Sequence, residues 1–203
     1  MHDQDVSAAL AVDLEGSFEQ VVLAYQHRLY GFALRLTGSP QDAEEITQDA
    51  FVRAYRALTT YPAARIRTLA LRPWLHQILL NVFRNRVRHR HLQLVPLDQG
   101  HEADDLELDD DKEARPDTAL ERAELKASLD ALVAALPERY RLAVVLRHIQ
   151  GLGYSEMAVV LKQPIGTVKA NVHRGVRMLR EAIDGQEHTT CSPAQSQAQR
   201  RMK

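Results

Sequence analysis

The sequence predicts an all-α protein with two small helical domains joined by a flexible acidic linker. Apolar residues recur at three- and four-residue spacing in several long stretches, as on one face of a helix. Aromatic residues make up 5% of the chain, and Leu, Ala and Val supply most apolar positions, which favours helices over a β-sandwich. We expect five parts: a flexible N-terminus (1–13), a first domain (14–92), the linker (93–117), a second domain (118–184) and a disordered tail (185–203).

Two consecutive helices open the first domain. The first carries a continuous apolar stripe formed by Phe18, Val22, Tyr25, Leu29, Phe32 and Leu36. It ends at Thr37-Gly38, and Ser39-Pro40 begins the next helix with a capping residue and a proline in the first turn. The buried side of the second helix is predicted to consist of Ile46, Ala50, Ala54 and Ala57 or Leu58.

A third long helix is expected to run from near Pro73-Trp74 to about His91. It follows the stretch from Thr59 to Arg72, where the apolar period weakens and a loop with a short helical piece is predicted. Trp74 is assigned to the core of the domain rather than to a surface on which bases stack. The other core positions of this helix are predicted to be Leu75, Ile78, Leu79, Val82 and Val87.

Charge is strongly segregated along the chain, although the net charge is −1. Between Asp49 and Asp98 there is no acidic residue, and nine arginines lie in that interval. Residues 98–117 are then rich in Asp and Glu, and the region after Pro137 is basic again. Two cationic modules suit a polyanion, and the anionic connector would be repelled from it. The connector either covers the cationic faces of the free protein or serves as an extended, solvated spacer.

The segment from Gly151 to Ile183 predicts a helix-turn-helix. Ser155 is expected to cap a short first helix, and the segment from Pro164 to Thr167 interrupts it and starts a second, basic helix. One face of the second helix carries the apolar residues Val168, Val172, Val176, Leu179 and Ile183. The other face is predicted to carry Lys169, Asn171, His173, Arg174, Arg177 and Arg180. This arrangement is typical of a recognition helix in the major groove, and the alternative is an ordinary surface helix.

These segments resemble a bacterial RNA polymerase sigma factor of the extracytoplasmic-function (ECF) group. In the first module the resemblance rests on RLTGSPQDAEEITQDAFVRAYRAL followed by PWLHQILLN. In the second it rests on ALPERYRLAVVLRHIQGLGYSEMAVVLKQPIGTVKANVHRGVRMLREAI. The resemblance implies a sigma region 2 helical bundle (14–92) and a sigma region 4 helix-turn-helix (118–184). It also implies a protein that binds core RNA polymerase, directs transcription from promoter DNA, and has an anti-sigma factor as a partner.

The resemblance also implies roles for individual residues. A polymerase-docking patch is expected at Glu45, Gln48, Asp49 and Val52. Contacts to the minus-ten element are expected from Asn81, which would read a flipped base, and from Arg84, Arg86 and Arg88, which would neutralise the DNA backbone. Contacts to the minus-thirty-five element are expected from Thr167, Lys169, Ala170, Asn171, His173, Arg174 and Arg177. The basic loop at 61–73 is longer than in most relatives.

Other classes of protein fit the sequence less well. A metalloenzyme would draw on His89, His91, Asp104 and Asp105, but the histidines lie among arginines, which oppose a divalent cation, and no HExxH or CxxC spacing occurs. We therefore expect no catalytic residue, no metal and no cofactor. A stand-alone helix-turn-helix regulator that never joins polymerase is the alternative function. The single cysteine, Cys191, and the absence of a long apolar run predict a cytoplasmic protein without membrane insertion.

Overall fold

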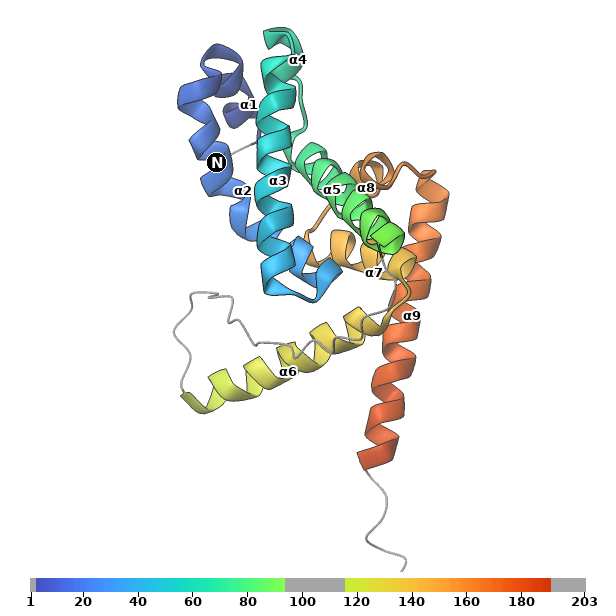
Figure 1. Ribbon diagram of the computed structural model, residues 1–203. Coiled ribbons are helices and arrows are strands. Elements are labelled where there is room, and N and C mark those ends of the chain that lie inside the picture. Colours follow the sequence, from blue (N-terminus) through green and yellow to red (C-terminus); the bar gives the residue numbers. More distant parts are fainter. Residues whose placement is uncertain (1–2, 94–115, 191–203) are drawn as a thin grey trace, which may run out of the picture.

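The computed structural model describes residues 3–93 and 116–190, and these residues are arranged as helices joined by short turns (Figure 1). The N-terminal module contains α1 (Asp3–Val12), α2 (Leu14–Thr37), α3 (Pro40–Thr59), α4 (Ala63–Arg67) and α5 (Leu71–Gln93). The C-terminal module contains α6 (Pro116–Ala135), α7 (Glu138–Val144), the π-helical turn η1 (Val145–Ile149), α8 (Tyr154–Leu161) and α9 (Ile165–Thr190). The predicted all-α class with two helical domains is confirmed.

The core of the N-terminal module lies between α2, α3 and α5, which pack on one another. Most of the predicted stripe residues point inward: Leu29, Phe32, Ile46 and Leu79 are fully buried. Val87, which was also predicted in the core, is instead 38% exposed. Gly38 adopts a left-handed conformation with φ of 68° and ends α2, as glycine does at many helix ends. The Ser39 side chain accepts a hydrogen bond from the Asp42 amide at 3.3 Å, which confirms the predicted cap of α3.

The N-terminal residues depart from the prediction of a flexible segment over 1–13. Residues 3–12 form α1, which packs against α2, α4 and α5. Val6 and Leu10 lie one helical turn apart and are both buried. Removing their apolar surface from water stabilises the folded state by about 25 cal/mol per Å², and this burial holds the short helix in place. The prediction was wrong because a ten-residue helix has fewer than three turns, which is too short for its apolar repeat to be recognised in the sequence.

The C-terminal module has the predicted helix-turn-helix in α8 and α9, with breaks at Pro137 and at Gly151–Gly153. The first helix of this motif, α8, begins at Tyr154, and Ser155 is not its N-terminal cap as predicted. Instead the Glu156 carboxylate accepts a hydrogen bond from the Gly153 amide at 2.6 Å. In the turn, Lys162 has a left-handed backbone with φ of 54°. At Gly175 a Cβ atom would lie 2.5 Å from Val144 Cγ2, so glycine permits the close approach of α9 to α7.

Two helices end beyond the expected positions. The last helix continues to Thr190, past 184, and α5 spans Leu71–Gln93, close to the expected span from near Pro73-Trp74 to about His91. Most of the expected flexible linker (93–117) lies outside the described residues, as do Cys191 and the rest of the tail. Among the described helices, none has the length and apolar character needed to cross a membrane.

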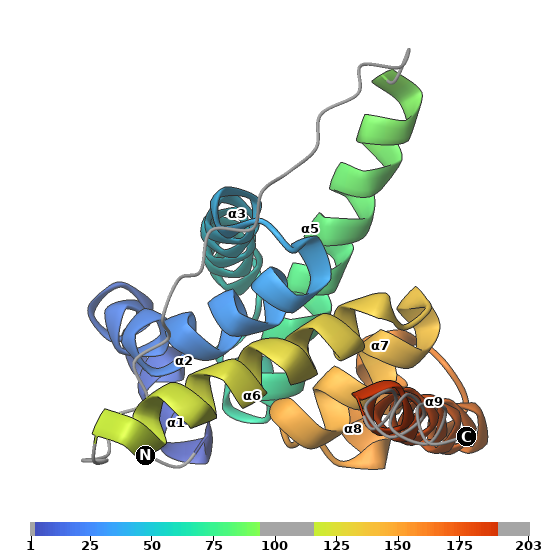
Figure 2. The same ribbon diagram turned by 90° about the horizontal axis from the view of Figure 1, so that it is seen from below.

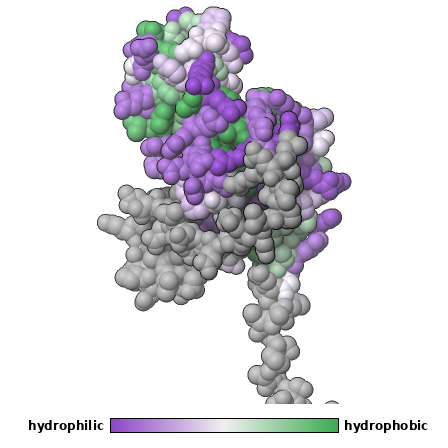
Figure 3. Space-filling model, in the orientation of Figure 1, coloured by the Kyte–Doolittle hydropathy of each residue, from purple (hydrophilic) through white to green (hydrophobic). Residues whose placement is uncertain are grey.

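The two modules pack against each other. Helix α8 contacts α5, and α6 contacts α2 and passes in front of it in the view from below in Figure 2. An ion pair joins Arg35 of α2 to Asp130 of α6, with 3.1 Å between Arg35 Nε and the carboxylate. The face seen in Figure 3 is largely hydrophilic, with apolar residues gathered mainly on the lobe that holds α1 to α4.

Candidate nucleic-acid interface

Helix α9 presents a cationic face to solvent. Val168 and Val172 are buried and hold it against its own domain. The opposite face exposes most of the predicted minus-thirty-five contacts, namely Thr167, Lys169, His173, Arg174 and Arg177, with Ala170 half-buried. Donors and cations on one exposed helix face suit base edges and phosphates in a major groove.

Asn171 does not belong to this exposed face. It is 7% exposed, and its Nδ2 donates a hydrogen bond to Gln163 Oε1 at 3.3 Å. Position 171 lies three residues after Val168 and four before Gly175, which places it on the packed side of the helix. In this arrangement the side chain that was predicted to contact DNA forms a structural bond, which ties α9 to the turn before it.

Tyr154, the first residue of α8, links the turn to the recognition helix. The Arg147 guanidinium lies 4.8 Å and the Lys169 ammonium 5.6 Å from the centre of its ring. Arg147 also donates to the Leu152 carbonyl at 2.9 Å. Cations over an aromatic face are attracted by its quadrupole, so Tyr154 helps to place Lys169 at the start of the exposed face.

The predicted minus-ten residues of α5 have different surroundings. Asn81 and Arg88 are exposed. Arg86 is held by two carboxylates of α3: it donates to Asp42 at 3.0 Å and to Glu45. The structure therefore joins Arg86 to Glu45, two residues that the sequence assigned to different surfaces. Arg86 links α5 to α3, and its guanidinium is not free for a DNA phosphate in this arrangement.

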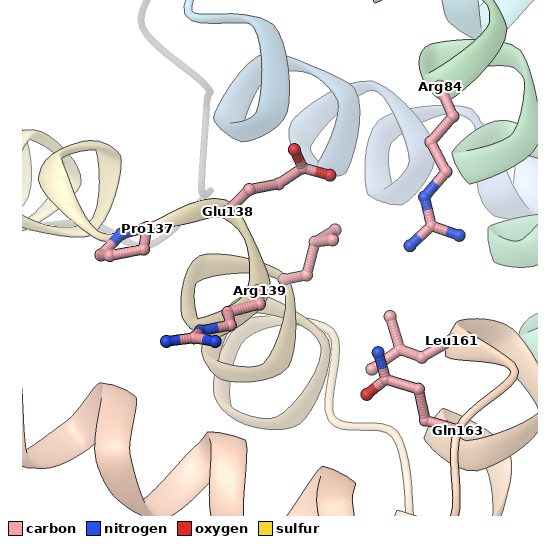
Figure 4. A pocket seen from close by; sticks show the side chains of 7 residues that line it. Arg84, Pro137, Glu138, Arg139, Leu161 and Gln163 are labelled. Atoms are coloured by element: carbon pink, nitrogen blue, oxygen red, sulfur yellow. The ribbon is translucent and has the colours of Figure 1, made fainter.

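Arg84 points into an open cavity of about 450 Å³ between the modules (Figure 4). The cavity is also lined by Glu138 and Arg139 at the start of α7, by Leu161 at the end of α8, and by Gln163 in the turn that follows. Arg84 thus faces the C-terminal module in this arrangement.

The predicted polymerase-docking residues gather on one face of α3. Glu45, Gln48 and Val52 are exposed, and Val52 keeps 47% of its surface in solvent. Asp49 lies between them and pairs with Arg53 at 2.9 Å. Spacings of three and four residues put these side chains on one side of the helix, opposite the buried Ile46 and Ala50. The result is an acidic and polar face with one apolar member.

Aromatic and cationic side chains contact one another between the basic loop and the first turn of α5. The Arg65 guanidinium lies 3.6 Å above the ring of Tyr61, and the Tyr61 and Trp74 rings are 6.1 Å apart. Trp74 is half-buried against the core, in line with its predicted place. Asn81 follows Trp74 by seven residues, or two helical turns, on the same side of α5.

A buried polar network between the modules was missed from the sequence. His76 of α5 is fully buried, with Nδ1 2.8 Å from the Arg72 carbonyl oxygen and Nε2 3.2 Å from Gln150 Oε1. The Gln150 amide donates to the Arg28 carbonyl at 3.2 Å, and Arg72 donates to the Gln150 carbonyl. Burial lowers the pKa of His76, with Arg72 and Arg28 adding to this and the two hydrogen bonds opposing it. The sequence did carry one signal of this network, because His76 lies next to the predicted core position Leu75 of α5.

Comparisons with known proteins agree with the two-module architecture. The family model of sigma-70 region 2 matches residues 21–93, and that of sigma-70 region 4 matches residues 126–179. The chain is similar to the RNA polymerase sigma-H factor of Pseudomonas aeruginosa, with 34% identity over 83% of this chain and 84% of that protein. It is also similar to the ECF RNA polymerase sigma-E factor of Escherichia coli K12, with 31% identity over 83% and 85%.

Two solved structures share the fold. One is CnrH in complex with the cytosolic domain of CnrY, with a TM-score of 0.63, 23% identity, and coverage of 90% of this chain and 97% of that one. The other is the sigma factor RpoE in complex with the anti-sigma factor NepR from Bartonella quintana, with a TM-score of 0.61, 23% identity, and coverage of 82% and 96%. By its matches to both sigma regions and its identity to full-length relatives, the chain belongs to the ECF family of RNA polymerase sigma factors.

Proposed function

We propose that this sigma factor docks on core RNA polymerase through the acidic face of α3 and reads a promoter with two separate surfaces. The observation that carries the proposal is the presence of this face and two cationic helical surfaces in one chain that matches both sigma regions. The protein acts by binding, in the cytoplasm, and needs no catalytic group of its own.

The minus-thirty-five element is read by α9. Lys169, His173 and Arg174 project from the exposed face near the N-terminal half of the helix. Helix-turn-helix proteins place this part of the recognition helix against base edges, with arginine and lysine favouring guanine or phosphate. Thr167 and Arg177 lie at the edges of the same face and suit phosphate contacts, which fix the register of the helix on the duplex.

The minus-ten element is opened by the N-terminal module. The Asn81 amide is exposed and has both a donor and an acceptor for the edge of a flipped base. Arg88 and, once the modules separate, Arg84 neutralise the DNA backbone along α5. The loop from Tyr61 to Ala70, with its exposed Arg65 and Arg67, lies at the end of α5 that would meet the unpaired strand.

Control by an anti-sigma factor is part of the proposal. RpoE of Bartonella quintana, which shares the fold, was solved with an anti-sigma factor bound. We infer that a partner of the same class holds this chain away from polymerase until a signal releases it.

Reconstitution with core polymerase tests the proposal against a stand-alone regulator. A sigma factor co-elutes with core enzyme and confers transcription that starts at particular sites in a genomic promoter library. A regulator would bind duplex DNA without polymerase and leave the start sites of core enzyme unselected. Absence of a stable complex with core polymerase would overturn the proposed function.

A further inference from the structure

The loop that precedes α5 has little of its own to keep it in shape. Helix α4 spans five residues from Ala63, follows Pro62 without a side-chain cap, and has Ile66 as its buried side chain. Helices this short are unstable in isolation, because the first turn fixes several dihedral angles for one hydrogen bond. The conformation of this loop must therefore come from what packs against it.

Helix α1 packs against α4 and makes a specific bond to the loop. Ser7 is 1% exposed, and its hydroxyl donates to the Leu69 carbonyl oxygen at 3.0 Å across 62 residues of sequence. Val6 and Leu10 lie on either side of Ser7 on the inner face of α1, and both are buried. The hydrogen bond from the buried hydroxyl holds the loop backbone at Leu69 against α1. The two buried apolar side chains hold α1 itself against the core.

Side-chain contacts connect the loop to the face of α5 that is proposed to read bases. Arg65 of α4 stacks on Tyr61, and the Tyr61 ring contacts Trp74 in the first turns of α5. Trp74 shares its side of α5 with Asn81, two turns away. A shift of α4 would therefore move Arg65 and Tyr61 relative to Asn81, and so change the shape of the surface that meets unpaired bases.

We propose that α1 is a positioning element for promoter opening, which holds the loop from Tyr61 to Ala70 in the shape that selects the minus-ten sequence. The proposal rests on the proposed function of that loop. Ser7 and Leu10 are positioning residues: they are buried and touch no DNA. A sigma factor with an unbraced loop would still bind polymerase and the minus-thirty-five element, because α1 packs mainly on α4 and α2, not on the proposed reading surfaces of α3 and α9.

Two α1 variants test the proposal, each with a matched control. Ser7→Ala removes the hydroxyl, and Ser128→Ala removes one from an exposed position of α6. Leu10→Ala removes buried apolar volume, and Val12→Ala trims a side chain on the same helix that is 81% exposed. Holoenzyme made with each variant is tested on promoters with randomised minus-ten bases and a constant minus-thirty-five element.

We expect Ser7→Ala and Leu10→Ala to reduce the preference for the best minus-ten sequence by about fivefold or more, in the range of losing one good base contact. Co-purification with core polymerase should stay at the wild-type level. Trp74 is the single tryptophan of the chain, so its fluorescence reports on the loop without any activity assay. Acrylamide quenching of Trp74 should rise in both α1 variants and stay unchanged in both controls.

The outcomes separate this inference from the function on which it rests. Unchanged selectivity and unchanged quenching in Ser7→Ala and Leu10→Ala, while Arg65→Ala and Asn81→Ala alter the minus-ten profile, would overturn the role of α1. If Arg65→Ala and Asn81→Ala also leave the profile unchanged, the loop is not the base-reading surface and the proposed function fails. Should Leu10→Ala not fold, Ser7→Ala decides the matter, since it removes one oxygen atom from an otherwise intact helix.

Discussion

His76 Nε2 in α5 lies 3.2 Å from Gln150 Oε1 in the segment before α8, and this pair joins the two modules across 74 residues. Both side chains are buried, and the Gln150 amide continues the network to the Arg28 carbonyl. The recognition helix packs on α8, which packs on α5, so α9 lies within roughly 20 Å of α5 at ordinary helix spacings. Promoter elements about 25 base pairs apart are separated by roughly 85 Å. The proposed reading of one element by each module therefore requires the modules to come apart on a promoter.

Gln150→Ala should loosen the contact between the modules. It removes the partner of His76 and leaves buried polar groups unsatisfied, at a cost of about 1–3 kcal/mol. Small-angle scattering of the free protein should show a larger radius of gyration for this variant. Gln20→Ala, at an exposed position of α2, serves as the control. A wild-type protein that already scatters as two separated modules would contradict the role of this network.

The free energy of unfolding should fall as the pH drops below about 6.5, the ordinary pKa of histidine. Burial lowers the pKa of His76 in the folded protein, so below 6.5 the unfolded chain binds a proton that the folded chain does not. Linkage then lowers the free energy of unfolding by at most about 1.4 kcal/mol per pH unit for this one group. Urea unfolding at several pH values checks this, and His76→Gln should remove that share of the dependence. An equal pH dependence in the variant would exclude His76 as its source.

Asp49→Arg combined with Gln48→Ala should abolish binding to core polymerase. The change reverses a charge in the centre of the exposed face of α3 and places two arginines one turn apart. The fold should survive, because both side chains point away from the buried Ile46 and Ala50. Glu19→Arg on α2 makes the same charge reversal at another exposed site and should leave co-purification intact. Co-purification of the double variant at wild-type yield would place the docking surface elsewhere.

Arg174→Ala or Lys169→Ala should weaken promoter binding without affecting folding. Loss of a base contact would relax specificity at one position of the minus-thirty-five element by roughly 1–3 kcal/mol, and loss of a phosphate contact would reduce the salt dependence. Arg180→Ala removes an equal charge from the same helix, outside the proposed contacts. Equal losses for Arg174 and Arg180 in fluorescence anisotropy with promoter DNA would point to nonspecific charge attraction.

Asn171→Ala should behave differently from its neighbours on α9. Its side chain bonds Gln163 and is buried, so the variant should lose about 1 kcal/mol of stability. Thermal unfolding should show the loss, while the base preference at the minus-thirty-five element should keep its wild-type pattern. A changed preference with unchanged stability would return Asn171 to the DNA-reading face.

The sequence by itself determined most of the helices, several of their breaks and the family, but it did not reveal α1. The period of Tyr25, Leu29 and Phe32, the cap at Ser39 and the break at Pro137 are local signals, because a helix is built from bonds between residues four apart. The same locality predicted the shared face of Glu45, Gln48 and Val52 on α3. The resemblance to the ECF family rested on two phrases taken together, one from each module and in this order.

Only the tertiary structure decided which of these surfaces are free. Ser7 meets Leu69 across 62 residues, Arg86 meets Glu45 across 41, and His76 meets Gln150 across 74. Pairs so far apart leave no periodic trace in the chain, since their approach depends on how whole helices pack. Asn171 shows the same limit at short range: a polar residue in a basic helix suggests an exposed position, and its burial follows from the turn that α9 packs against.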